Sequence, residues 1–488
     1  MKPGVLFKLF IALYCVAGVA TMPDYGVPLD ELTQRAIGIE NNRIFTSGTL
    51  ENVQKHGPFG PIFESTAYVL EQLVYSQPMW VKLYLRHGLL FGIFVIAVVG
   101  FYSIAKKLFK NNYTSGLITV MFAAYPPLFA HAHYNSKDTL FLSFCIFSLY
   151  FLIEFFETKK WKALIAFSIL AGISVTLRLS GALWFLVCFS GLWLRREIRP
   201  VKALHFTLIS ISVCAVSFYI FFPWVWSNPI GALVRIFEYS SQNPWPSATL
   251  WNSEWISPGA SPSMYLPVWL GVSVPLLTIA LFFAGTIRIC MSSSLRSSAI
   301  VWIILTAFWF PVLCIAILKP TLYDGWRHMQ FLLVPIFFIS GFGLDWIFAR
   351  YNAIWLPYSI AGYTALVSFF WHPYGYVYFN EAYAAAIRPN SFTQDYWGLS
   401  SLQTLKWLAK QDPKPEKKIY SFTESPLLQS QYLKESARAG FHFVQSRDSA
   451  DYEIELRRQQ FFWPTKGKEI FSICPMKDTI IRVIKLQH

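Results

Sequence analysis

The chain has 488 residues, of which 55% are hydrophobic and only 14% are charged. So little charge cannot cover the surface of a water-soluble protein of this size, and a disordered chain is excluded for the opposite reason, its excess of apolar residues. The formal net charge is +14. We expect no nucleic-acid binding, because much of this excess lies in short loops between apolar runs, as in membrane proteins. The composition therefore predicts a multi-pass α-helical membrane protein.

Apolar runs long enough to cross about 30 Å of hydrocarbon recur up to Trp371, and they predict about eleven transmembrane helices. The runs are Val5–Thr21, Leu89–Ala105, Thr114–Ala130, Leu140–Phe156, Leu164–Leu177, Gly181–Leu194, Ala203–Phe222, Leu266–Ile287, Ser298–Leu318, Met329–Phe348 and Ile354–Trp371. Residues 1–20 also have features of a signal peptide, with Lys2 and Lys8 near its start and small residues up to Ala20. Removal of that segment would leave the later topology unchanged.

Basic residues gather in every second loop between these runs, which predicts that those loops are cytoplasmic. They are Lys106, Lys107 and Lys110; Lys159, Lys160 and Lys162; Arg195, Arg196, Arg199 and Lys202; Arg288 and Arg296; and Arg350. The intervening loops, and everything after Trp371, then face the exoplasmic side. In a bacterium this would be an integral protein of the plasma membrane with a periplasmic C-terminus.

This topology divides the chain into three predicted parts. Residues 1–371 form a transmembrane domain with long exoplasmic loops at 22–86 and 223–265, and residues 372–411 form an exoplasmic linker that contributes to a pocket. In residues 412–488, strand-like patterns alternate with a helical stretch, which predicts a small exoplasmic α/β or α+β domain. The strands are expected at Lys418–Phe422, Phe441–Val444, Tyr452–Glu455, Ile470–Ile473 and Thr479–Ile484, and the helix at Ser425–Ala439.

Two polar motifs on the exoplasmic side carry carboxylates. Asp30 and Glu31 follow the first predicted span, where an N-cap with an acid in the first helical turn is the simpler interpretation. The tight loop before the fourth span contains His131, His133, Lys137 and Asp138. Asp138 could cap the next helix, but such a concentration of ionisable groups at a membrane boundary is costly unless it lines a hydrated cavity. Two histidines are too few for a metal site, and we predict no metal or other cofactor; a divalent cation is not indicated.

A third motif, before the tenth span, is rich in cations. Lys319, Arg327 and His328 offer donors suited to a phosphate group, and a guanidinium can bind two oxygens at once. Snorkelling at the interface would explain Lys319 but not the whole cluster. Arg178, in a tight turn between the fifth and sixth spans, is a fourth cation on the same side.

These motifs together resemble the GT-C membrane glycosyltransferases, specifically the protein O-mannosyltransferase and lipid A aminoarabinose transferase branch. The acidic pair followed by a helix and the Asp138 at the start of a span are similar to features of that branch. Three later segments resemble its bacterial-type members: Tyr323–His328, His372–Glu381 and Asp395–Ser400. Trp326 departs from the small or acidic residue expected there, which bears on donor specificity rather than on class.

The resemblance implies transfer of a sugar, with inversion, from a polyprenyl-phosphate donor to a hydroxyl of a protein, lipid or glycan acceptor, in contact with membrane lipids. Asp30 would be the general base, Glu31 would orient the acceptor or the base, and Asp138 is the alternate base. The donor phosphate would be bound by Lys319, Arg327, His328 and Arg178. The expected pocket residues are His131, His133, Lys137, Tyr323, Asp324, Tyr374, Tyr376, Tyr378, Asn380 and Glu381.

Three other functions stay open at this point. A catalytically inactive scaffold or lipid-binding subunit would share the fold, and an envelope hydrolase would use the same carboxylates with water as the acceptor. A secondary transporter is disfavoured, because the predicted spans carry almost no ionisable residues near their centres and no inverted repeat is visible.

Overall fold

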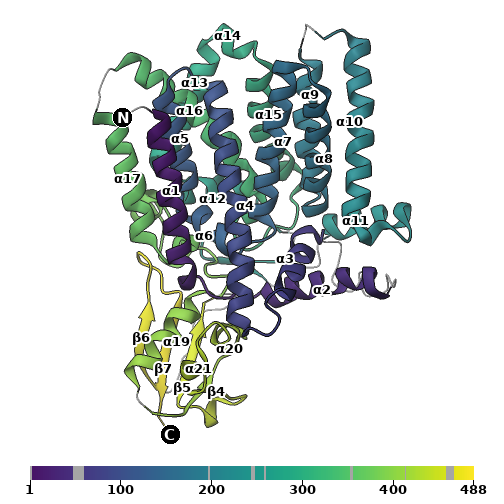
Figure 1. Ribbon diagram of the computed structural model, residues 1–488. Coiled ribbons are helices and arrows are strands. Elements are labelled where there is room, and N and C mark those ends of the chain that lie inside the picture. Colours follow the sequence, from purple (N-terminus) through teal and green to yellow (C-terminus); the bar gives the residue numbers. More distant parts are fainter. Residues whose placement is uncertain are drawn as a thin grey trace.

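A bundle of long helices forms most of the computed structural model, and a small sheet lies at one end of it (Figure 1). The structure describes residues 3–47, 60–195, 198–242, 248–257, 260–351, 355–412, 414–457 and 467–487. The bundle contains α1 (Pro3–Thr21), α4 (Met79–Leu108), α5 (Asn112–Ala123), α7 (Asp138–Thr158), α8 (Trp161–Leu177), α9 (Ser180–Trp193), α10 (Pro200–Phe221), α13 (Leu276–Met291), α15 (Ala299–Leu318), α16 (Leu333–Arg350) and α17 (Trp355–Trp371).

Several of these helices have the length and composition of membrane spans, so the chain is an integral membrane protein. Within the described ranges, six helices qualify: Gly4–Asp24, Met79–Leu108, Asp138–Thr158, Pro200–Phe221, Ala299–Leu318 and Arg327–Arg350. A bent pair of helices would make a seventh span if it is counted as one, and α8 and α9 are shorter apolar helices. The multi-pass helical class is confirmed, whereas helix length alone does not establish a count of eleven spans.

Two predicted spans are broken in the structure, and prolines explain both breaks. The predicted span Thr114–Ala130 divides into α5 and α6 (Pro126–Tyr134), and the span Leu266–Ile287 divides into α12 (Tyr265–Ser273) and α13, which meet at a bend of 117°. Proline has no N–H to continue a helix and disfavours helical geometry in the residue before it.

At the bend between α12 and α13, the side chain of Asn380 satisfies backbone groups that the break leaves without helical partners. Its Nδ2 donates to the carbonyls of Gly271 and Val274 at 2.7 and 2.6 Å. A broken helix in a membrane requires such partners, because no water is present to replace them.

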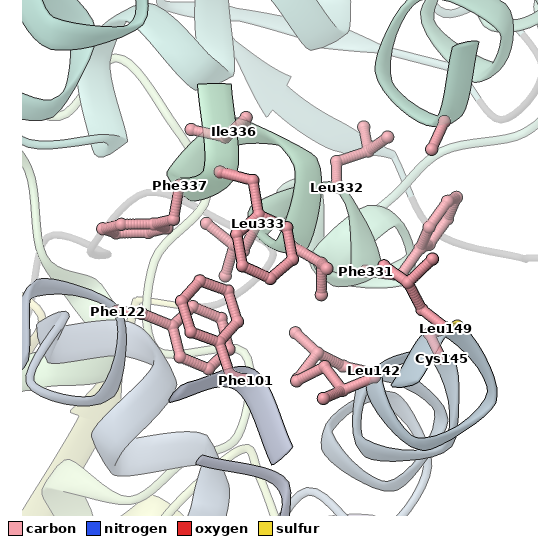
Figure 2. Close-up of a cluster of buried hydrophobic side chains, with 14 of the residues drawn as sticks. Phe101, Phe122, Leu142, Cys145, Leu149, Phe331, Leu332, Leu333, Ile336 and Phe337 are labelled. Carbon is pink, nitrogen blue, oxygen red and sulfur yellow. The ribbon is translucent and has the colours of Figure 1, made fainter. Parts of the chain in front are cut away.

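Aromatic packing holds the segment that leads into α16. The Phe101 ring stacks on Phe122 and Phe338 at centroid distances of 4.3 and 4.2 Å, and Figure 2 shows Phe331 in the same buried cluster as Leu142 of α7. These contacts fix η4 (Arg327–Leu332), a 3-10 helix that begins at Arg327. The hydrophobic core therefore positions a charged residue at the end of the bundle nearest the sheet.

Helices α13 and α16 cross closely at a pair of glycines. A Cβ added to Gly343 would lie 2.3 Å from the Leu281 carbonyl oxygen, and one added to Gly285 would lie 1.8 Å from that of Ile339. Small residues of this kind let helix backbones approach each other inside a membrane.

Shorter elements lie across the end of the bundle that carries the sheet. Helices α2 and α11 extend sideways there, away from the bundle (Figure 1). The set consists of α2 (Glu31–Ser47), α3 (Ile62–Gln72), α6, η3 (Pro223–Val225), α11 (Pro229–Gln242), the hairpin β1 (Thr249–Trp251) and β2 (Glu254–Ile256), α12, α18 (Glu381–Ala386) and η5 (Gly375–Val377). Two further small helices are η1 (Met22–Asp24), after α1, and α14 (Ser293–Arg296), which precedes α15.

The C-terminal region is built on a mixed sheet with the order β4-β3-β5-β7-β6. Strand β3 is parallel to β4 and β5, whereas β7 is antiparallel to β5 and β6. The elements are α19 (Ser400–Gln411), β3 (Lys417–Tyr420), α20 (Ser425–Ser430), α21 (Glu435–Arg438), β4 (Phe441–Phe443), η6 (Arg447–Ser449), β5 (Tyr452–Leu456), β6 (Gly467–Ile473) and β7 (Ile481–Leu486). The predicted helix Ser425–Ala439 is two short helices, because Tyr432 and Leu433 turn into the core between them.

The sheet region holds the loop that follows α1. The Val27 N–H donates to Gln429 Oε1 at 2.9 Å, and Gln429 Nε2 donates back to the Val27 carbonyl at 2.5 Å. On the other side, Tyr383 donates to Asp478 at 2.6 Å. The two parts of the chain are thus joined through buried polar contacts.

Candidate active site

A buried cluster of ion pairs centred on Arg86 fixes the loop that carries the acidic pair. Arg86 Nε donates to Glu31 Oε1 at 2.7 Å and Nη1 donates to Glu71 Oε1 at 3.3 Å, while Nη2 donates to Glu64. Burial raises the pKa of Glu31, but the charges and hydrogen bonds of Arg86 and His87 together outweigh burial and lower that pKa to about 2. The Glu31 carboxylate, which also lies 3.5 Å from His87 Nε2, is therefore ionised and held by its partners.

Asp138, at the start of α7, is the centre of a second buried charge cluster. Its Oδ1 accepts a hydrogen bond from Arg178, and its Oδ2 lies 3.6 Å from Arg327 Nη1. Asn135 Nδ2 donates to the same Oδ2 at 3.0 Å. The turn after α8, the loop before α7 and the start of η4 therefore converge on one carboxylate.

Arg327 is only 9% exposed and is surrounded by aromatic rings. Its guanidinium carbon lies 4.6 Å from the ring centre of Trp397 and 5.4 Å from that of Tyr396. Its Nη2 donates to Asp324 Oδ2 at 3.2 Å. The aromatic faces and the carboxylates compensate for burial of the charge and hold the guanidinium in one position.

Asp30 and Lys137 line the same small cavity, and Trp397 forms part of its wall. Asp30 is half-buried and immediately precedes α2. Burial, followed by the positive charge of Arg178, lowers the pKa of Lys137 to about 8, against the opposing charge of Asp30. Because Trp397 also packs on Arg327, the carboxylate, the amine and the guanidinium lie around one indole ring.

A large apolar cavity of about 660 Å³ lies between α8, α9, α10 and α11. Phe185, Phe237 and other apolar side chains form most of its wall, but Arg178 and His328 also line it. Since Arg178 binds Asp138, this cavity reaches the charge cluster. Its chemistry suits a molecule with a long apolar part and an anionic head.

A second cavity, of about 60 Å³, lies next to Arg327 and is lined mainly by aromatic residues. His131, Tyr376 and Tyr378 contribute to it, together with Tyr396. His131 Nδ1 lies 3.2 Å from Gln330 Nε2, and its Nε2 lies 3.4 Å from the Tyr396 hydroxyl. The segment from Tyr323 to Gln330 thus contributes to both cavities. Tyr323 and His328 line the large apolar cavity, and Arg327 and Gln330 line the small aromatic one.

The structure brings most of the predicted site residues to this end of the bundle. Those at or beside the two charge clusters and the cavities are Asp30, Glu31, His131, Lys137, Asp138, Arg178, Tyr323, Asp324, Arg327, His328, Tyr376 and Tyr378. Tyr374 is half-buried one residue before η5, which is the element that carries Tyr376.

Four predicted residues have other surroundings. Lys319 is the exposed C-cap of α15. Glu381 is exposed and accepts a hydrogen bond from Tyr363 at 2.7 Å. His133 contacts the Gly18 and Phe129 carbonyls at 3.0 and 2.9 Å, and Asn380 holds the broken helix described above, so both have structural contacts.

The sequence analysis did not identify Arg86, its partners Glu64 and Glu71, or Gln330. The presence of ionisable residues in and near the first loop could have indicated the Arg86 cluster. Nothing in their spacing shows which of these charges form ion pairs. Tyr396 and Trp397 belong to the segment Asp395–Ser400, which the sequence analysis named for its resemblance, but it predicted no role for either residue.

Comparison with known proteins identifies the fold. Residues 89–226 match the family model described as dolichyl-phosphate-mannose-protein mannosyltransferase. The chain has the fold of the GT-C membrane glycosyltransferases. It is similar to ArnT from Cupriavidus metallidurans bound to undecaprenyl phosphate, with 12% identity, a TM-score of 0.52, and coverage of 99% of this chain and 98% of that one.

The apo structure of ArnT from the same organism gives a consistent result. It has 13% identity and a TM-score of 0.50, and the match covers 98% of this chain and 97% of that one. At such identities the likeness concerns the fold alone. No curated protein has a sequence that matches this chain.

Proposed function

We propose that this protein transfers a sugar from a polyprenyl-phosphate carrier to a hydroxyl group of a protein, lipid or glycan. The observation that carries the proposal is the large apolar cavity of about 660 Å³, whose wall includes Arg178 and His328 and which reaches the Asp138 cluster. A polyprenyl chain would occupy the apolar part, and its phosphate would meet the cations.

The comparisons support this choice of ligand. One similar structure is bound to undecaprenyl phosphate, and the matching family model is described by a dolichyl-phosphate-linked mannose donor. The matched residues 89–226 include Asp138 and Arg178. Both likenesses therefore agree with a lipid-phosphate donor at this site.

Asp30 is the proposed general base. It would take the proton of the acceptor hydroxyl while the hydroxyl oxygen attacks the anomeric carbon, and the bond from that carbon to the phosphate oxygen would break with inversion. The electron pair would remain on the carrier phosphate. Glu31 and Asp138 are less suited to this role, because Arg86 holds the first and two arginines hold the second.

Arg327, Arg178, His328 and Lys137 would stabilise the charge that develops on the leaving phosphate. They surround the Asp138 cluster or line the cavities beside it, and the arginines are held in place before the donor binds. Donors fixed in advance stabilise a transition state without a cost of reorganisation. The positive charge of the opposite loops supports placement of this end of the bundle on the exoplasmic side.

Transfer by the purified protein in lipid vesicles, with radiolabelled undecaprenyl-phosphoryl hexoses and envelope extracts as acceptors, tests the proposal. Asp30→Asn should lower the rate about 100-fold or more, which is the usual contribution of a general base. Asp448→Asn, at an exposed site on the sheet region, is the matched control and should leave the rate unchanged. Retention of transfer by Asp30→Asn together with its loss in Asp138→Asn would assign the base to Asp138. Release of free sugar in place of a glycosylated product would instead show a hydrolase.

A further inference from the structure

The small aromatic cavity beside Arg327 has a distinctive chemical lining. Aromatic rings dominate it, including those of Tyr125, Trp269, Tyr378 and Tyr396. Among the described residues that line it, none is Asp or Glu, and Arg327 is the one with a permanent charge. Aromatic faces with scattered hydrogen-bonding groups are suited to the apolar faces and hydroxyl groups of a sugar ring.

Two carboxylates, those of Asp324 and Asp395, are next to lining residues in the sequence, and both already accept hydrogen bonds from the protein. Asp324 accepts from Arg327 at 3.2 Å. Asp395 accepts from the backbone N–H groups of Leu399 and Ser400 at 2.9 and 3.2 Å, at the start of α19. A ligand that carries a protonated amine would therefore meet Arg327 without a carboxylate to pair with, which is costly in a buried site.

Several polar atoms of the lining residues are buried without a hydrogen-bond partner in the described part of the structure. They include the Tyr378 hydroxyl, Gln330 Oε1 and Arg327 Nε. An unpaired buried donor or acceptor costs about 1–3 kcal/mol, so a ligand that supplies the missing partners gains affinity. Hydroxyl groups, which both donate and accept, can pair with all three kinds of atom.

We propose that this cavity binds the sugar of the donor and selects a single uncharged monosaccharide over an amino sugar. The inference rests on the proposed function, because Arg327 lines this cavity and the next residue, His328, lines the cavity proposed for the lipid. The volume of about 60 Å³, compared with about 660 Å³ for the large cavity, limits the occupant to one ring rather than an oligosaccharide.

Equilibrium binding to the full-length protein in nanodiscs at pH 6.5 tests the inference. The probes are undecaprenyl phosphate, its glucose, mannose and galactose phosphodiesters, and the glucosamine phosphodiester, which differs from the glucose compound by one amine. The preferred hexose donor should bind about 10-fold or more tightly than the glucosamine donor, because the protonated amine of the latter would meet Arg327 without a carboxylate to pair with. The Tyr378→Phe variant should reduce that advantage severalfold.

The Gln330→Glu variant gives a readout that loss of folding cannot imitate. It places a carboxylate in the cavity and should shift the preference toward the glucosamine donor, whereas Gln72→Glu makes the same change at an exposed site and should not. If all hexose donors bind no more tightly than glucosamine, or no more tightly than undecaprenyl phosphate itself, the inference is overturned and the lipid-phosphate function stands. If undecaprenyl phosphate and all four sugar donors fail to bind, the proposed function falls as well.

Discussion

Ser136 and Glu64 connect the two charge clusters of the site. The Ser136 hydroxyl donates to Glu64 Oε1 at 2.5 Å, and Glu64 is bound in turn by Arg86. Ser136 stands two residues before Asp138, so the loop that presents Lys137 and Asp138 is anchored to the same cluster that holds Glu31. A change at Arg86 should therefore affect both acidic motifs.

Removal of the Arg86 side chain should destabilise the protein strongly. Arg86→Ala would leave three buried carboxylates without their central partner, and loss of one member of a buried ion pair costs about 3–5 kcal/mol. Arg43→Ala, which breaks an exposed pair with Glu40, is the control and should cost about 1 kcal/mol or less. Thermal unfolding in detergent measures both variants, and similar midpoints would contradict the importance of the cluster.

Donor binding should weaken as the pH rises through about 8. The pKa of Lys137 is lowered to about 8 in the folded protein, so the amine loses its charge there and no longer attracts the phosphate. A phosphodiester-linked donor is the right probe, because its own charge is constant between pH 7 and pH 9. Titration of affinity in that range measures the effect. Lys137→Arg should make binding independent of pH, and a wild-type affinity that does not fall would refute the role of Lys137.

Filling the large apolar cavity should block the carrier. Ala182 lines this cavity, and Ala182→Phe would place a ring where the polyprenyl chain is proposed to lie. The affinity for undecaprenyl phosphate should fall about 10-fold or more, because apolar chain contacts would be lost. Ala17→Phe, at an exposed position on α1, adds the same ring elsewhere. Equal affinities for the two variants would place the carrier outside this cavity.

The crossing of α13 and α16 should not tolerate a larger residue. In Gly343→Leu the new Cβ would lie 2.3 Å from the Leu281 carbonyl oxygen, so the helices must separate. We expect a loss of about 1–3 kcal/mol or more, as for overpacked cores. At Gly92, an added Cβ meets no described atom within 4 Å, and Gly92→Leu should be nearly neutral. Unfolding midpoints in detergent compare the two variants.

Much of the architecture was predictable because hydrophobicity and local strand patterns are short-range signals. The helical class follows from the apolar runs, and each predicted strand of the C-terminal region overlaps a strand of the sheet. The breaks at Pro126 and Pro275 were missed, since proline is tolerated in some membrane helices and sequence alone does not reveal which neighbour will satisfy the freed carbonyls.

Individual residues of the candidate site could be predicted from the sequence, but which charged residues pair with each other could not. Asp30, Asp138 and Arg327 stood out because charge is unusual beside apolar runs. Their convergence depends on helix packing between residues up to 297 positions apart, the interval from Asp30 to Arg327. The exposed position of Lys319 and the buried cluster around Arg86 follow from the same helix packing. No local sequence pattern predicts that packing.

The paired contacts between Gln429 and Val27 make the strand-bearing region an integral brace for the segment just ahead of Asp30. Proteolytic separation of the two parts would accordingly release the loop that carries Asp30, and the bundle expressed by itself would lack the contacts that hold this loop.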